Sequence, residues 1–142
     1  MCYAVYIATA TPQPTTEFVE GVSKLCLSVP EAGELERLAG KFTLPHVYHV
    51  GADGGCSCGF SFQSQFYDDS KWPNSKASPP ALLDLLNELT THATVEYYCC
   101  WSGNEADPIQ NYRILNSREM SLKENYFDLE EDEFIWFKPE KA

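Results

Sequence analysis

Basic residues are scarce in this sequence, and they do not cluster. The chain holds 10 lysines and arginines against 21 aspartates and glutamates, which gives a formal net charge of −11. Nucleic-acid binding needs a basic surface that displaces counterions, and an anionic membrane surface repels an acidic chain. We therefore expect no nucleic-acid partner and no membrane partner, whereas a basic protein or a cation is electrostatically favoured.

Long apolar runs are also missing. No stretch approaches the roughly 20 apolar residues that span a bilayer, and the opening residues M-C-Y-A-V-Y-I-A-T-A lack the positive segment and the length of a signal peptide. The six cysteines are an even number, which in a secreted chain would suggest disulfides. Without an export signal we expect a cytoplasmic protein with free thiols.

The motifs of nucleotide chemistry are absent as well. The chain has no G-x-x-x-x-G-K-S/T loop, no G-x-G-x-x-G after a predicted strand and no G-x-S-x-G elbow. We therefore expect no nucleotide cofactor.

What is present indicates a single globular domain over residues 1–142, because 44% of the residues are hydrophobic and 13% are aromatic.

Alternation and apolar runs predict strands at 2–9, 22–27, 94–101, 112–115 and 134–137, in addition to the two strands of a predicted hairpin. The first strand is apolar on both faces, so we expect it to be central. Helical spacing predicts helices at 30–41, with a capping box from Ser28 to Glu31, and at 79–91, capped by Ser78. The acidic run 130–133 is interpreted as a solvated turn. The fold class is α+β, with one mainly antiparallel sheet and two helices packed on one of its faces.

The most informative stretch is V-Y-H-V-G-A-D-G-G-C-S-C-G-F-S-F at 47–62. Asp53-Gly54 between two strand-like runs predicts a β-hairpin. Alternate side chains of a strand share a face, so Cys56 and Cys58 would be neighbours, and a two-residue turn would place His49 across from Cys58. Two thiolates and an imidazole suit zinc or another transition metal, so we predict a metal site at Cys56, Cys58 and His49.

Two alternatives to the metal site remain open from the sequence. Free cysteine is often buried, so these thiols can be purely structural. In that case the protein is an acidic interaction module, similar to an inhibitor or an immunity protein, that covers a basic partner or forms a homo-oligomer. The chain can also be a cysteine-dependent enzyme, with His49 as a general base for Cys58 or Cys56, or with Cys2 as the nucleophile.

The same glycine- and cysteine-rich block resembles the signature of a small family of uncharacterised bacterial proteins. In that family the block reads Tyr-x-x-Gly-Ser and then a Gly-Cys-Gly-Cys-Gly-Phe run, and the chains begin Met-Cys before a strand. The resemblance covers mainly residues 47–62, with a weaker match at 2–8, and this chain departs from it at Ala52 and Ser57. The family implies no activity, so the resemblance adds interest to the motif without assigning it a role.

Overall fold

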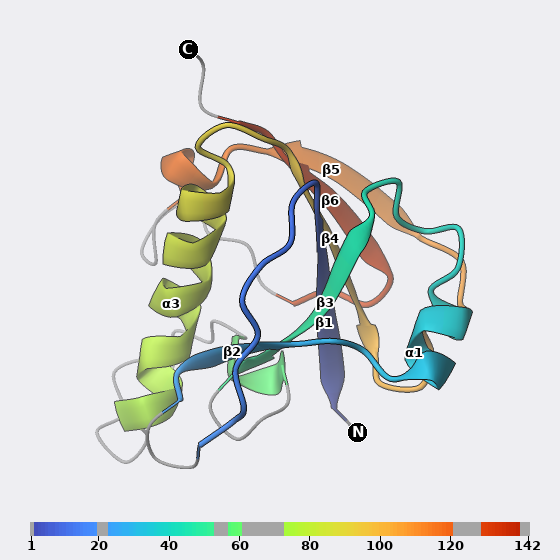
Figure 1. Cartoon of the computed structure of the whole chain (residues 1–142), viewed down its shortest axis with the longest axis horizontal. Coiled ribbons are helices and arrows are strands. Elements are labelled where there is room, and N and C mark those ends of the chain that lie inside the picture. The colour runs from blue at the N-terminus through green and yellow to red at the C-terminus, as the bar shows by residue number, and fades with distance from the viewer. Residues whose placement is uncertain (1, 20–22, 53–56, 61–72, 121–128, 140–142) are drawn as a thin grey trace.

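A six-stranded sheet forms the centre of the molecule in the computed structural model, which describes residues 2–19, 23–52, 57–60, 73–120 and 129–139 (Figure 1). The strands, in chain order, are β1 (Tyr3–Thr9), β2 (Leu25–Ser28), β3 (His46–Ala52), β4 (Val95–Trp101), β5 (Asn111–Leu115) and β6 (Glu133–Phe137). Their order across the sheet is β2-β3-β1-β4-β6-β5, and β5 runs parallel to β6 while all other pairs are antiparallel. The predicted α+β class is confirmed, with a mixed sheet in place of a purely antiparallel one.

The two principal helices lie on opposite faces of the sheet, not on one face as predicted (Figure 1). Helix α3 (Pro73–Leu89) packs Leu82 and Leu86 against one face, and α1 (Ala32–Arg37) lies on the other, where Leu38 just after it is buried. The reason is visible in β1, which is central as expected. Its alternate side chains supply both cores, so each face of the sheet needs a cover.

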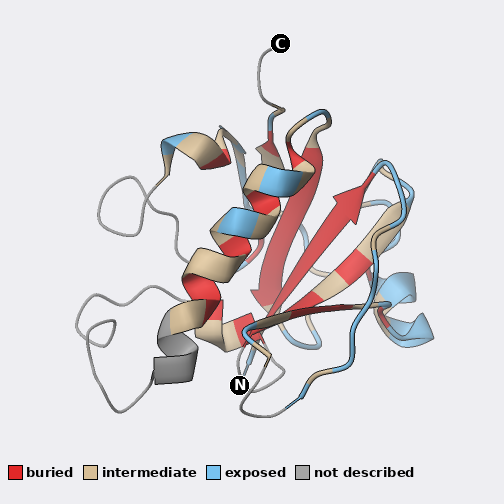
Figure 2. Ribbon diagram, turned by 60° about the vertical axis from the view of Figure 1, so that its left-hand side comes forward, coloured by how far each residue is buried: buried red, intermediate tan, exposed pale blue. Residues whose placement is uncertain are grey.

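The two helices differ in how far they are buried. Helix α3 has buried positions from Ser78 to Leu86, whereas α1 buries none of its residues (Figure 2). An isolated helix of six residues is not stable in water, so α1 depends on contacts with the rest of the protein. Those contacts are largely polar, and they form the site described below.

The second arm of the predicted hairpin is not a strand where it is described. Residues Ser57–Phe60 form a 3₁₀ turn, η1, while 53–56 and 61–62 lie outside the described residues. The prediction fails because β3 pairs with β1 on one side and with β2 on the other, which leaves no free edge for a third strand. Phe60 instead packs into the core on the α3 side.

Ser57 joins η1 to the sheet between β1 and β3. Its buried hydroxyl accepts a hydrogen bond from the Val5 amide at 2.8 Å and donates one to the Val50 carbonyl at 2.6 Å. Beside it, the Cys58 sulfur accepts a hydrogen bond from the Tyr3 amide at 3.1 Å. The Ser57 side chain thus satisfies buried backbone groups of both β1 and β3.

Both helices begin at other residues than predicted, and neither Ser28 nor Ser78 caps them as predicted. Helix α1 is shorter than predicted, and its capping box joins Glu31 to Glu34 rather than Ser28 to Glu31. Helix α3 begins at Pro73, so Ser78 lies inside it and donates a hydrogen bond to the Lys24 carbonyl instead of capping the helix. Within the described ranges, no helix is long and apolar enough to cross a membrane.

The acidic run at 130–133 is only partly solvated, which corrects its interpretation as a surface turn. Glu130 and Glu131 are exposed, but Asp132 and Glu133 are buried. Asp132 adopts a positive φ of 57° and accepts a hydrogen bond from the Tyr98 hydroxyl. Glu133 is paired with Arg113 at 2.7 Å, so its charge serves the packing of β5 on β6.

Candidate functional site

A pocket of about 580 Å³ opens on the α1 side of the sheet, and we call it the α1 pocket. Its walls come from the start of β1, the end of β2 with the residues after it, α1, β3, and the turn that follows β4. The residues that line it include Cys2, Glu31, Glu34, Arg37, His49 and Glu105. Segments far apart in the sequence therefore meet at one concave surface, as is typical of ligand sites.

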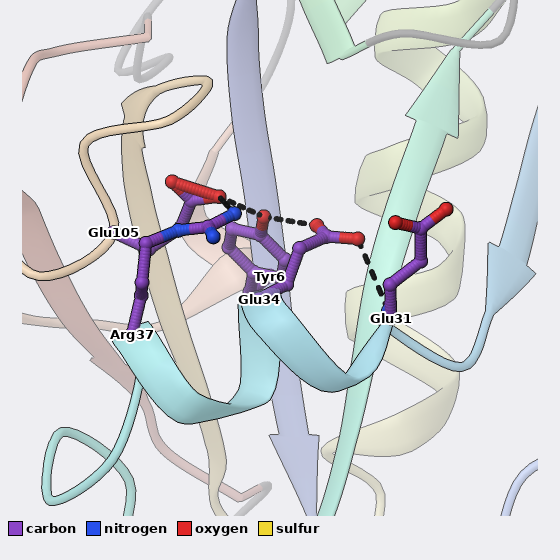
Figure 3. A network of polar contacts seen from close by, with 5 residues as sticks. All are labelled: Tyr6, Glu31, Glu34, Arg37 and Glu105. Carbon is purple, nitrogen blue, oxygen red and sulfur yellow. Dashed lines mark hydrogen bonds and ion pairs between the residues drawn. The ribbon is translucent and has the colours of Figure 1, made fainter.

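A polar network ties α1 to the sheet at this pocket (Figure 3). The Tyr6 hydroxyl lies in a short hydrogen-bond contact with Glu34 Oε2 and at 3.1 Å from Glu105 Oε1. Arg37 Nη2 also lies 3.1 Å from Glu105 Oε1, while Glu34 Oε1 accepts a hydrogen bond from the Glu31 amide. The network explains how a helix with no buried residue is held in place.

Burial, and then the hydrogen bond with Glu34, raise the pKa of Tyr6. The phenol therefore keeps its proton at neutral pH and remains a donor. That single proton faces two carboxylate acceptors, Glu34 and Glu105, so it cannot satisfy both fully.

Glu105 is the least exposed acidic group of the pocket, with a relative accessibility of 1%. Burial alone would raise its pKa, but the hydrogen bonds from Arg37, its own amide and Tyr6 more than offset that effect, so the pKa is lowered. The group is thus a carboxylate at neutral pH. Its Oε1 carries the contacts to Tyr6 and Arg37, whereas Oε2 is buried and accepts no hydrogen bond from any other described residue.

Arg37 reaches Glu105 from the last turn of α1, and its side chain remains 41% exposed. The contact with Glu105 raises the pKa of Arg37, so the guanidinium stays charged. Gly33 leaves room for it, because a Cβ at that position would lie 3.2 Å from Arg37 Nη1. A larger residue at Gly33 would thus disturb the guanidinium that faces Glu105.

His49 faces the α1 pocket from β3. It stands opposite Tyr6 on β1 and opposite Ser28 on β2, and its ring meets the Tyr6 ring edge-on at 5.5 Å. Burial lowers the pKa of His49, although the charges of Glu34 and Glu105 oppose the shift. The imidazole is therefore neutral at pH 7 and can accept a proton.

The predicted metal-site residues are only partly described. His49 lines the α1 pocket, Cys58 lies in η1 beside the Tyr3 amide, and Cys56 is outside the described residues. The predicted cross-strand pairing of His49 with Cys58 is wrong, because both flanks of β3 are occupied by β1 and β2. Among the described residues no group of three or more His, Cys, Asp or Glu side chains is placed to hold a metal ion.

Zinc binding by Cys56, Cys58 and His49 therefore stays a prediction. Elemental analysis of protein purified without a histidine tag tests it. Zinc or iron below about 0.1 equivalent per chain would reject it.

Three of the other cysteines are buried thiols. Burial is the first cause that raises the pKa of Cys26, of Cys99 and of Cys100, the last to about 12. Such thiols are almost entirely protonated at neutral pH and react slowly. Cys2, by contrast, is exposed and lies in the wall of the α1 pocket.

From the sequence we did not expect Tyr6, Glu34, Arg37 or Glu105 to be site residues. Tyr6 and Glu34 are 28 positions apart and Tyr6 and Glu105 are 99 apart, so no local spacing links them. One local signal was available: Glu31, Glu34 and Arg37 share the helical spacing that places side chains on one face. It indicates a polar helix face, but not what that face meets.

Comparisons of the chain with protein-family models, with curated proteins and with solved structures gave no match. The resemblance of residues 47–62 to a bacterial family thus stays a prediction.

Proposed function

We propose that this protein binds a small polar molecule in the α1 pocket. The observation that supports this most is Glu105, a buried carboxylate in the pocket wall whose Oε2 accepts no hydrogen bond from another described residue. Buried acceptors without partners are rare and costly, so such an atom indicates a missing donor. A pocket of about 580 Å³ lies within the usual range for small ligands.

A purely structural role explains part of the network but not all of it. Tyr6 and Arg37 bind Glu105 Oε1, and together with Glu34 they hold α1 on the sheet. That role needs one oxygen of Glu105 only. That role does not explain the second oxygen, which no neighbouring residue contacts, or the pocket beside α1.

Cysteine-dependent catalysis is a second candidate in the same pocket, because Cys2 and His49 both line it. A neutral imidazole can take a proton from a thiol or from a bound molecule. If Cys2 is a nucleophile, it should alkylate far faster than an ordinary exposed thiol at pH 7, and His49→Asn should slow it. A Cys2 rate that His49→Asn does not change would count against catalysis.

The ligand proposal is tested by blocking the pocket. Ser102 is an exposed residue of the pocket wall, whereas Ala106, exposed in the same turn, is not part of the wall. A set of small amines, acids, alcohols and amides is screened by ligand-observed NMR against the protein and against Ser102→Trp and Ala106→Trp. We expect binding that Ser102→Trp abolishes and Ala106→Trp retains. Binding that neither variant affects, or no binding by any compound, would overturn the proposal.

A further inference from the structure

We infer that the molecule bound in the α1 pocket is an organic cation that carries N–H donors, namely a primary ammonium or a guanidinium group. This inference rests on the proposed function and specifies its ligand class.

The charge balance of the pocket is negative. Its wall holds Glu31, Glu34 and Glu105 against the single guanidinium of Arg37, and His49 is neutral at pH 7. Three carboxylates and one cation leave two formal negative charges. The net charge of −11 on the chain acts in the same direction and draws cations toward the surface.

Glu105 Oε2, which no neighbouring residue contacts, distinguishes between kinds of cation. Glu105 Oε2 is buried, so a partner for it must donate a hydrogen bond as well as carry charge. A quaternary ammonium has no N–H and could not donate a hydrogen bond to that oxygen. A bare metal ion is disfavoured, because no cluster of three or more metal-ligating side chains occurs in the described part of the chain.

The protein already shows that this carboxylate accepts such a group. Arg37 places a guanidinium nitrogen 3.1 Å from Glu105 Oε1, and Figure 3 shows the other oxygen of Glu105 outside the marked contacts. With a ligand cation that donates a hydrogen bond to Oε2, both oxygens of the Glu105 carboxylate would accept a hydrogen bond from a cation. Glu31 and Glu34, on α1, would add to the attraction because both line the same pocket.

The test is a series of ligands that share one four-carbon chain. Binding of n-butylammonium, n-butylguanidinium, n-butyltrimethylammonium, n-butanol and butyrate is measured by calorimetry at pH 7 and low salt. We expect the first two to bind about ten- to a hundredfold more tightly than the other three, because a hydrogen bond to a charged group has about that effect. We also expect their binding to weaken as salt is raised.

Two variants locate the effect. Glu105→Gln should reduce n-butylammonium binding about tenfold or more, whereas Glu36→Gln, at an exposed position of α1 outside the pocket wall, should leave it unchanged. If Glu105→Gln does not fold, the ligand series on the unmodified protein still decides the matter. Equal affinity for n-butyltrimethylammonium and n-butylammonium would overturn the inference.

The outcomes separate this inference from the proposed function. Tight binding of butyrate or n-butanol that Ser102→Trp abolishes would overturn the cation inference and leave ligand binding standing. Absence of any binding sensitive to Ser102→Trp would overturn both.

A last arm distinguishes a free amine from a side chain of a basic protein. The peptide acetyl-Gly-Lys-Gly-amide and its form with an acetylated lysine are compared with n-butylammonium. Binding of the lysine peptide and not of its acetylated form supports the same chemistry and points to a protein side chain. Binding of n-butylammonium alone supports it with a free amine as the ligand.

Discussion

At the scale of single residues, Tyr6 and Glu105 are the central residues of the polar network at the site. Tyr6 donates one proton toward two carboxylates, and Glu105 accepts contacts at one oxygen while the other lacks a donor from its neighbours. Both side chains are almost fully buried, so bulk water does not easily supply what is missing. A polar network that is satisfied only in part is costly for folding alone, and we relate its presence to binding.

His49 gives a residue-scale prediction about pH. Because burial lowers the pKa of His49 in the folded protein, the unfolded chain binds more protons below about pH 6.5. The contribution of His49 should therefore lower the free energy of unfolding as the pH falls from 7 to 5. His49→Asn should show a shallower decline in urea unfolding measured at several pH values.

His92, an exposed histidine after α3, provides the matched control as His92→Asn. Comparing the two variants separates the effect of removing the pocket imidazole from the effect of removing any histidine. If both variants give the same pH dependence as the unmodified protein, burial does not lower the pKa of His49 as described.

At the scale of elements, the strands were easier to predict than the site. Strands β1 and β4 carry apolar side chains on both faces, so their positions follow from short-range pattern alone. The hairpin at Asp53-Gly54 was wrong as regards its described second arm, since residues 57–60 form η1. Local turn chemistry cannot show that β3 has partners on both flanks, because those partners come from distant segments.

The site was harder to predict for the same reason. His49 was singled out from the sequence and does line the α1 pocket, but its neighbours there are Tyr6 and the glutamates rather than a cysteine across a hairpin. Their proximity depends on the order of the strands and on the side of the sheet that α1 covers. Neither is encoded in the spacing of residues along one strand or helix.

Ser57 provides the prediction for elements. Ser57→Ala removes the hydroxyl that satisfies the Val5 amide and the Val50 carbonyl, and both groups would be left buried without that partner. We expect the free energy of unfolding to fall by about 1–3 kcal/mol, measured by urea denaturation. Ser102→Ala, at an exposed serine, should change it by less than about 0.5 kcal/mol. Equal effects of the two substitutions would show that the bridge contributes little.

At the scale of the whole molecule, the two faces of the sheet have different tasks. The α3 face is closed by the larger apolar cluster, while the α1 face combines a smaller apolar cluster with a six-residue helix that polar contacts hold in place. The first arrangement supplies stability, and the second leaves a cavity with charged walls. The division explains how a chain of 142 residues accommodates both a core and a site.

The reactivity of the cysteines gives a prediction for the whole molecule. Alkylation of the native protein at pH 7, mapped by mass spectrometry, should label Cys2 and leave Cys26, Cys99 and Cys100 unlabelled until the protein is denatured. A thiol with a pKa of about 12, as at Cys100, is ionised to about one part in 10⁵ at pH 7. Rapid labelling of Cys99 or Cys100 in the native protein would contradict the packing of β4 between its neighbours.

A titration of isotope-labelled protein with n-butylammonium, followed by the backbone amide resonances, tests most directly whether a ligand binds in the α1 pocket. We predict saturable shifts that are concentrated at the wall of the α1 pocket, at Ser28, His49, Ser102 and Glu105. We also predict that β5, at the far edge of the sheet, stays unchanged. Shifts spread over β5, or none at the pocket wall up to millimolar ligand, would contradict the claim that this pocket is where the protein acts.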